Sequence, residues 1–185
     1  DANNALVTAS TIETSFVYRT SNGGVNWISV HSDLTLHAFV NSWYFKDPNN
    51  GLMIADPNVL RSNIWKTSNG GLTWDSSGIN FDTWESSYPN SIFGNGDVVY
   101  FGSSVNKFFK TGNFGANWVP VPLPIHGSEA IWFNSPTNGL IGWFNELVRT
   151  TNGGDSFTII SGVPNMYMFG LTGTTNGNYW LASRN

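Results

Sequence analysis

The segment Tyr18-Arg19-Thr20-Ser21-Asn22-Gly23-Gly24-Val25-Asn26-Trp27 recurs along this chain of 185 residues. It returns almost unchanged as Trp65-Lys66-Thr67-Ser68-Asn69-Gly70-Gly71-Leu72-Thr73-Trp74. Two looser copies are Phe109-Lys110-Thr111-Gly112-Asn113-Phe114-Gly115-Ala116-Asn117-Trp118 and Val148-Arg149-Thr150-Thr151-Asn152-Gly153-Gly154-Asp155-Ser156-Phe157. The threonines at 20, 67, 111 and 150 are separated by 47, 44 and 39 residues. A period of this length indicates serial copies of one supersecondary unit.

A second landmark keeps the same period. Asn-Gly pairs at 50–51, 95–96, 138–139 and 176–177, and Asn4-Ala5 near the start, each precede a short run rich in β-forming residues. Asn-Gly supplies the positive backbone dihedrals of a tight hairpin turn. Each repeat is therefore interpreted as two hairpins with strands A to D. Strand A would cover 38–45, 129–133 and about 166–171, and the repeated motif would join strands C and D.

The predicted fold is an all-β propeller of four-stranded antiparallel blades. We expect one propeller segment over 1–185, with blades at about 36–86, 87–128 and 129–163 and partial blades at 1–35 and 164–185. The chain would contain five B strands but four each of strands A, C and D. This number of strands does not divide into complete blades of a closed ring. We therefore expect about four blades of a larger propeller, completed by further blades of the same parent protein or by a partner chain.

Composition excludes several functional classes. Charged residues make up 11% of the chain, the net charge is -4, and the basic residues are scattered, so no nucleic-acid partner is expected. No apolar run approaches the roughly 20 residues of a membrane span. Cysteine is absent, which excludes disulfides and thiolate metal sites, and no cofactor is expected. None of the 24 Asn lies in an N-x-Ser/Thr context. Together these features favour a secreted, periplasmic or cell-surface bacterial protein.

The recurring pattern Ser/Thr-x-Asp/Asn-x-Gly-x-x-Trp/Phe resembles the Asp-box, or bacterial neuraminidase repeat. This repeat occurs in sialidases, xyloglucan-cleaving glycosidases, sortilin-type receptors, photosystem assembly factors and secreted surface proteins of gliding bacteria. The matching positions are Thr20, Asn22, Gly24, Trp27, Thr67, Asn69, Gly71, Trp74, Thr111, Asn113, Gly115, Trp118, Thr150, Asn152, Gly154 and Phe157. Asn replaces Asp in all four copies, and Phe157 replaces Trp. The resemblance implies a propeller with these motifs on the rim, away from the face that carries activity.

The D–A and B–C connections fall on the face opposite the hairpin turns, where propellers usually bind ligands. The predicted D–A connections are about 31–37, 75–89, 119–128 and 161–165, and the B–C connections are about 8–15, 56–63, 103–106 and 144–146. In the longest of these, Trp84 beside Asp82 and Glu85 would suit stacking on a sugar ring with hydrogen bonds to its hydroxyls. Alternatively, Trp84 fills the blade beneath it.

Other side chains on this face are candidates for binding or catalysis. Asp56, Asp82, Glu85 and Glu129 could include a glycosidase pair, whose carboxylates lie about 5–5.5 Å or about 6.5–9.5 Å apart. A sialidase would need three arginines on the substrate, and of the four present only Arg61 is well placed. His37 and His126 are candidate binding residues. These two histidines and His31 each lack a second ligand close by in the sequence, as a metal site would require. The preferred interpretation is that they are loop histidines whose hydrogen bonds are made to neighbouring residues.

Two further patterns have alternative interpretations. The basic residues before the motif threonines (Arg19, Lys66, Lys110 and Arg149) form either a charged stripe for an acidic partner or a set of solvated strand ends. The alternating stretch Val119-Pro120-Val121-Pro122-Leu123-Pro124 is either a recognition segment or a stiff D–A connection along a blade edge.

The sequence as a whole favours a non-catalytic, secreted or cell-surface propeller that binds a protein or a glycan through its loop face. The alternative is part of a glycoside hydrolase, sialidase-like or xyloglucanase-like, that uses paired carboxylates.

Overall fold

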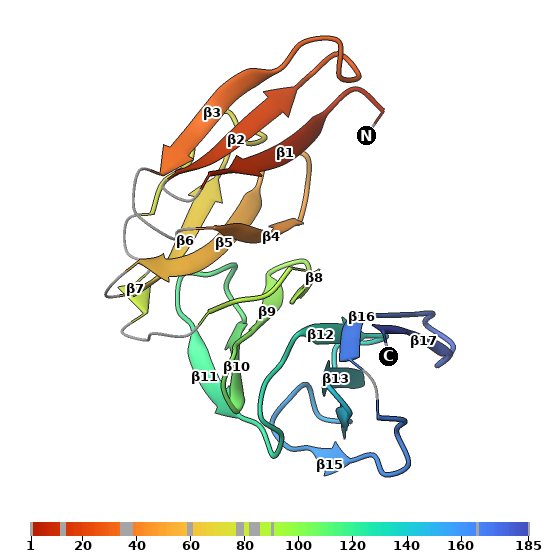
Figure 1. The fold of residues 1–185 in the computed structure, drawn as a ribbon. Helices are drawn as coiled ribbons and strands as arrows, with labels where there is room; N and C mark the ends of the chain where they lie inside the picture. Colours follow the sequence, from red (N-terminus) through yellow and green to blue (C-terminus); the bar gives the residue numbers. More distant parts are fainter. Residues whose placement is uncertain are drawn as a thin grey trace. The chain divides into compact units, whose positions relative to one another are not determined.

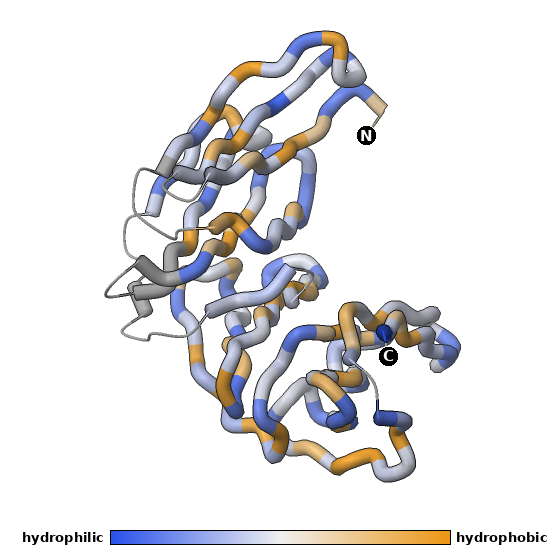
Figure 2. Tube along the Cα trace, in the orientation of Figure 1, coloured by the Kyte–Doolittle hydropathy of each residue, from blue (hydrophilic) through white to orange (hydrophobic). Residues whose placement is uncertain are grey.

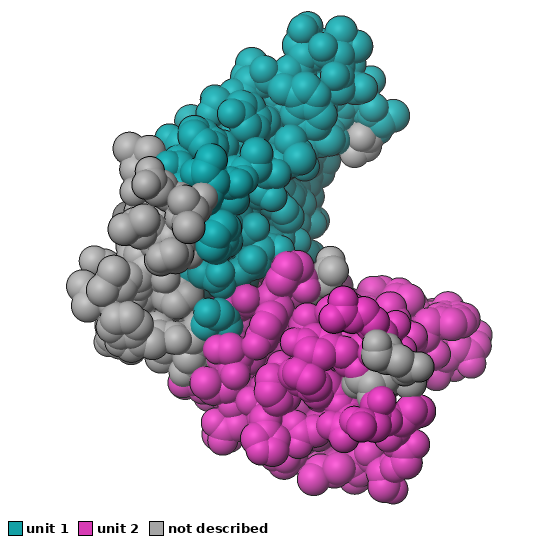
Figure 3. All heavy atoms as spheres, viewed as in Figure 1, with its two compact units in different colours: residues 1–86 teal, residues 87–185 magenta. Residues whose placement is uncertain are grey.

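The computed structural model describes residues 2–11, 14–33, 39–58, 61–76, 80–81, 86–89, 91–165 and 167–184. Regular structure in this part of the chain is β-strand throughout, arranged in antiparallel sheets (Figure 1), which confirms the all-β prediction. No helix in it is long and apolar enough to cross a bilayer. The chain forms two compact units, residues 1–86 and 87–185, coloured separately in Figure 3.

The first unit contains two sheets in which each strand pairs with the next along the chain. The first sheet is β1 (Ala5–Ser10), β2 (Ser15–Thr20) and β3 (Ile28–Asp33). The second is β4 (Val40–Phe45), β5 (Gly51–Asn58), β6 (Arg61–Thr67) and β7 (Asn80–Phe81). Val17 of β2 packs with Val40, Met53 and Trp65 of the second sheet. The core of this unit therefore lies between its two sheets.

The second unit contains three sheets with the same serial pairing. They are β8 (Ile92–Asn95), β9 (Val98–Gly102), β10 (Lys107–Thr111) and β11 (Val119–Pro122); β12 (Ala130–Phe133), β13 (Gly139–Trp143), β14 (Glu146–Thr150) and β15 (Thr158–Ile159); and β16 (Tyr167–Gly173) with β17 (Tyr179–Arg184). Met168 of β16 packs with Leu140 and Leu147 of the neighbouring sheet.

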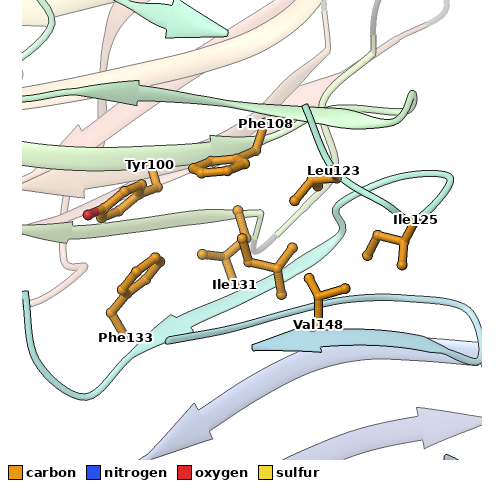
Figure 4. Packing of buried hydrophobic residues seen from close by; sticks show 8 residues of the cluster. Tyr100, Phe108, Leu123, Ile125, Ile131, Phe133 and Val148 are labelled. Atoms are coloured by element: carbon orange, nitrogen blue, oxygen red, sulfur yellow. The ribbon is translucent and has the colours of Figure 1, made fainter. Parts of the chain in front are cut away.

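The main core of the second unit fills the space between its first two sheets. In Figure 4, Tyr100 and Phe108 lie across from Ile131, Phe133 and Val148. The rings of Tyr100 and Phe133 stack with centroids 4.2 Å apart. Figure 2 shows that apolar stretches are interrupted repeatedly by polar residues, as expected for strands that bury one face. Aromatic packing between sheets thus accounts for much of the Trp and Phe content.

The four repeated motifs form the same hairpin, each between the last two strands of its sheet. In the last copy, the buried Thr150 hydroxyl donates to Asn152 Oδ1 and accepts from the Gly154 N–H at 2.9 Å. Equivalent bonds are made by Thr20, Thr67 and Thr111. Gly154 has φ +89°, and a Cβ there would lie 2.8 Å from the Phe108 ring of the preceding sheet. The motif is therefore a structural turn that also contacts the neighbouring sheet.

The Asn-Gly pairs have two different structural roles. Gly96 and Gly177 have positive φ, as the turn prediction required. Gly51 and Gly139 are instead the first residues of strands and have no positive φ. A Cβ at Gly51 or Gly139 would lie 2.6 Å from the ring of Phe45 or Phe133, respectively. At those two positions the prediction of positive dihedrals was wrong, because the absence of a side chain makes room for a cross-strand phenyl ring.

Two local predictions also require correction. His31 lies in β3 opposite Val17 and against the Trp65 ring at 4.9 Å, so it belongs to a strand and not to a connection. The proline-rich stretch is the edge strand β11, in which Pro120 pairs with Phe109 and Pro122 with Lys107. Proline has no backbone N–H and is tolerated in an edge strand, because the N–H groups on the outer side of that strand form no hydrogen bonds to another strand.

Candidate functional site

Four aromatic side chains form a continuous row on the second unit, hereafter the aromatic row. Trp143 ends β13, Phe144 begins the two-residue turn to β14, and Tyr167 and Phe169 lie on β16. Consecutive ring centroids are 4.7, 3.9 and 4.8 Å apart. The row joins two sheets where β13 ends and β14 and β16 begin, which is the predicted loop face.

The row is partly open to solvent. Phe144 is 39% exposed and Phe169 is 38% exposed. Phe144 has φ +49°, a region that a bulky L-residue adopts at a cost of about 1–3 kcal/mol. The Arg184 guanidinium lies 5.9 Å from the Phe169 ring centroid and borders that end of the row with a cation–π contact.

The other end of the row is built by the loop between β11 and β12. A Cβ at Gly127 would lie 3.0 Å from three atoms of the Trp143 indole, so a larger residue there would have to shift this ring. The next residue back, His126, donates its backbone N–H to Glu146 Oε2 at 2.8 Å, and its Nδ1 lies 2.8 Å from Glu146 Oε1. The exposed imidazole and the carboxylate thus form a polar border beside Trp143.

Glu129 places a buried carboxyl near the row. It is 6% exposed, and its Oε2 has no hydrogen-bond partner among the described residues. Burial raises the pKa of Glu129 above the ordinary value of 4.5. The pKa of Tyr167 is also raised, first by desolvation and then by the charges of Glu129 and Tyr88. The unpartnered Oε2 could accept a hydrogen bond or, when protonated, donate one.

The predicted site residues divide into three groups. His126 and Glu129 lie at the aromatic row. Asp56 lies in the first unit, where its Oδ1 accepts a hydrogen bond from Asn41 Nδ2 at 2.7 Å. Arg61 begins β6, and its side chain lies outside the described part of the structure.

His37, Asp82, Trp84 and Glu85 lie outside the described residues. Their proposed binding roles therefore stay predictions. Within the described ranges, no three His, Asp or Glu side chains gather as a metal site would require.

The four members of the aromatic row were missed by sequence reasoning. Trp143 ends a short apolar strand, and Tyr167 and Phe169 alternate along another, so these three resemble ordinary core residues. Phe144 was placed in the predicted B–C connection 144–146 but was not singled out as a binding residue. One signal was present in the sequence. The tight turn after β13 has Phe144-Asn145 where glycine would be the unstrained choice, and an aromatic in such a turn is directed outward.

The sequence matches no protein-family model and no curated protein, whereas solved structures match the fold. YCF48 bound to a D1 peptide matches with a TM-score of 0.65 and 16% identity, over 95% of this chain and 60% of that one. The GH74 enzyme of Niastella koreensis matches with a TM-score of 0.65 and 16% identity, over 96% of this chain and 32% of that one. The GH74 xyloglucanase from Xanthomonas campestris matches with a TM-score of 0.64 and 13% identity, over 94% of this chain and 32% of that one.

The chain spans 60% of the length of the YCF48 structure and about a third of the GH74 enzymes. The structural similarity, with TM-scores of 0.64–0.65, establishes the fold. The low sequence identities leave the activity open, since one propeller architecture carries unrelated functions. The likeness agrees with the serial antiparallel sheets and with the repeat period. The chain therefore has the β-propeller fold, built from antiparallel blades.

Proposed function

We propose that this chain is a non-catalytic propeller of the Asp-box type that binds a glycan through the aromatic row. The single observation that carries the proposal is the row itself, in which four rings lie in sequence and two of them are more than a third exposed. Sugar rings offer a flat apolar face and polar edges. A row of aromatic faces bordered by polar groups is complementary to such a ligand.

The polar groups around the row support the same conclusion. Glu129 has an unpartnered buried oxygen for a sugar hydroxyl, and the Glu146 carboxylate and Arg184 guanidinium border the two ends. Buried polar atoms are rarely left without a partner. Because Glu129 Oε2 is closed to solvent, a ligand hydroxyl would reach it only after a local movement of the surrounding residues. The contact would then gain strength from the low polarity of its surroundings.

A secreted or cell-surface location in a bacterium belongs to the same proposal. Support comes from the low charge content, the absence of cysteine and the lack of N-x-Ser/Thr sites. The four Thr-x-Asn-x-Gly hairpins support the Asp-box assignment, because each has the same hydroxyl-to-turn hydrogen bonds. Further blades, from the same parent protein or from a partner, are part of this proposal.

Isothermal titration against soluble neutral polysaccharides and their oligosaccharides tests the proposal. The panel contains β-linked glucan, xyloglucan, xylan and chitin oligomers. We expect saturable binding to at least one of them and a loss of roughly tenfold or more in affinity for Phe169→Ala, which removes an exposed stacking ring. Glu129→Gln keeps the shape of the side chain and should alter affinity through its hydrogen bond.

Trp180→Ala is the matched control, because Trp180 is an aromatic that is 55% exposed on β17 but lies outside the row. The Trp180→Ala variant should bind the glycan with the same affinity as the wild type. Failure of every glycan to bind, or equal losses for Trp180→Ala and Phe169→Ala, would contradict the proposal. Binding of polypeptides alone to the same row would favour the protein-binding alternative, for which the peptide complex of YCF48 is the precedent.

A hydrolase segment is the second candidate, and Glu129 is the observation that favours it. Burial raises the pKa of this carboxyl, as a general acid requires. Release of reducing ends from a bound glycan, abolished by Glu129→Gln while binding persists, would establish this alternative. Binding without turnover supports the non-catalytic proposal.

A further inference from the structure

His126 is an exposed residue in a loop that is otherwise firmly anchored. The residues on either side of it, Ile125 and Gly127, are buried, and Ile125 belongs to the main core of the second unit. The next backbone N–H, that of Ser128, donates to the carbonyl of Ser103 at 2.9 Å. The His126 side chain itself is 80% exposed. The loop therefore presents this imidazole to solvent from a fixed backbone.

Glu146 holds the imidazole in place on that backbone. Its Oε2 accepts the backbone N–H of His126, and its Oε1 lies 2.8 Å from His126 Nδ1. Rotation of the imidazole away from this position would break the second bond. Glu146 pairs with Trp143 across the β13–β14 hairpin, and the His126 and Trp143 ring centroids lie 6.2 Å apart. The imidazole is thus fixed beside the Trp143 end of the aromatic row.

The contact with Glu146 also determines which imidazole nitrogen carries the proton. A carboxylate offers only acceptors, so Nδ1 of His126 is the donor in this contact. A neutral imidazole has one donor and one acceptor, and Nε2 is therefore left with a free lone pair. Within the described part of the chain, no residue hydrogen-bonds to this Nε2. A free histidine in water favours the opposite tautomer, with the proton on Nε2, so Glu146 reverses the ordinary preference.

Stability gives little reason for this arrangement. A hydrogen-bonded pair of exposed charged groups contributes about 0–1 kcal/mol, because water competes for both partners. The arrangement does place an acceptor at the end of a row whose next ring, Phe144, is 39% exposed. A sugar ring that stacks on an aromatic side chain directs its hydroxyls sideways, toward polar groups at the border. A fixed acceptor at this border is complementary to a hydroxyl that donates.

We propose that His126 Nε2 accepts a hydrogen bond from a hydroxyl of the sugar unit at the Trp143–Phe144 end of the row, and that Glu146 is the positioning residue that makes Nε2 an acceptor. This inference rests on the proposed function, because it concerns the same site. It adds a requirement on the ligand, which must have a free hydroxyl at that unit. A unit whose hydroxyls are methylated or esterified lacks the donor.

Nuclear magnetic resonance of the full chain labelled with ¹⁵N-histidine tests the tautomer without any ligand. At about pH 8.5, above the ordinary titration range of histidine, long-range proton–nitrogen correlations distinguish the two neutral tautomers. The chain has three histidines, and the signals of His126 are those that vanish in His126→Gln. We expect the Nδ1–H form in the wild type and a shift toward the Nε2–H form in Glu146→Ala, because no carboxylate then holds the proton on Nδ1.

Asp155→Ala is the matched control. It also removes one carboxylate from the second unit, but the Asp155 side chain is 72% exposed and pairs with Lys110. The variant therefore changes the net charge by the same amount as Glu146→Ala. It should leave the tautomer of His126 unchanged.

Isothermal titration with the glucan, xyloglucan, xylan and chitin oligomers tests the contact with the ligand. For an oligomer that binds the wild type, His126→Ala should weaken affinity roughly threefold to tenfold, the cost of one neutral hydrogen bond. Glu146→Ala should weaken it by a similar factor. The double variant should bind no more weakly than His126→Ala, because Glu146 acts only through His126. Asp155→Ala should bind like the wild type.

The outcomes separate this inference from the proposed function. An Nε2–H form in the wild type, or an unchanged tautomer in Glu146→Ala, would overturn the inference alone. Binding that is weakened by Phe169→Ala but not by His126→Ala would do the same. Additive losses in the double variant would contradict the positioning role of Glu146. If no oligomer binds the wild type, the inference fails together with the proposed function.

Discussion

Replacement of Thr150 by valine should destabilise the second unit far more than replacement by serine. Valine keeps the shape of threonine but exchanges the hydroxyl for a methyl group. Thr150 is 1% exposed, and its hydroxyl donates to Asn152 Oδ1 at 3.0 Å. It also accepts from the N–H groups of Asn152 at 3.3 Å and Gly154 at 2.9 Å.

The magnitude follows from what each change leaves unpaired. In Thr150→Val the buried Gly154 N–H loses its acceptor, which costs about 1–3 kcal/mol. The exposed Asn152 can use water, so its two bonds add about 1 kcal/mol between them. Thr150→Ser keeps all three bonds and loses one buried methyl group, about 1 kcal/mol. We therefore expect Thr150→Val to cost about 2–4 kcal/mol and Thr150→Ser about 1 kcal/mol.

Urea denaturation of the two variants, compared through their unfolding midpoints at equal slope, measures the difference. Thr158→Val is the control, because Thr158 is exposed on β15 and should change stability by less than about 0.5 kcal/mol. If Thr150→Val and Thr150→Ser lose equal stability, the hydroxyl is not what holds the hairpin, and the account of the repeat is wrong.

Three further predictions concern buried groups of the second unit. Burial raises the pKa of Glu129 above its unfolded value of 4.5, so the wild type should lose stability relative to Glu129→Gln as the pH rises from about 4 through the folded pKa. Urea midpoints of the two proteins at pH 4 and 7.5 measure this loss. A stability difference that is the same at both pH values would contradict the prediction. Burial raises the pKa of Tyr100 from 10.0 to about 12, so its stabilising effect is complete below pH 10 and is lost as the pH rises through about 12. An ultraviolet titration should show a phenol that ionises near pH 12, and Tyr100→Phe should remove it. Gly127→Ala should displace the Trp143 ring and cost about 1–3 kcal/mol, whereas Gly112→Ala, whose Cβ meets nothing within 4 Å, should be nearly neutral in the same thermal melts.

The repeat made most of the fold predictable. Threonine, asparagine and glycine at fixed offsets determine a hairpin through local hydrogen bonds, and local interactions are what a sequence reveals best. The four copies form the same bonds, and the strands between them pair in chain order. The hairpin prediction held because each turn contains its own acceptor and its own donor.

Predictions failed where a long-range contact decided the local structure. Gly51 and Gly139 follow an Asn as turn glycines do, but each receives a phenyl ring from the strand across. Pro120 and Pro122 were placed in a connection, although β10 pairs with both on the outer edge of a sheet. In both cases the local structure depends on the strand that lies beside the residue. The intrinsic β-propensity of a residue does not reveal that neighbour.

The candidate site was less predictable than the fold for the same reason. His126 and Glu129 were named from their position on the loop face, and both lie at the aromatic row. The row itself joins the end of one sheet to the start of the next. Phe144 and Tyr167 are far apart in sequence and meet only because successive blades pack side by side.

Two phenylalanines of the second unit have a strained backbone but differ in how far their rings are buried. Phe114 and Phe144 are the two described residues other than glycine with positive φ, at 50° and 49°. Phe114 replaces a motif glycine and is 6% exposed, so burial of its ring, about 1.5–3 kcal/mol, offsets the strain. Phe144 is 39% exposed and recovers less of that energy from burial. Asparagine or glycine would make the same turn without strain. Phe144 recovers part of the cost of its strained backbone through its contacts with the Trp143 and Tyr167 rings, with centroids 4.7 and 3.9 Å away. Under the proposed function, the part of the ring that stays exposed is the part that would contact the glycan.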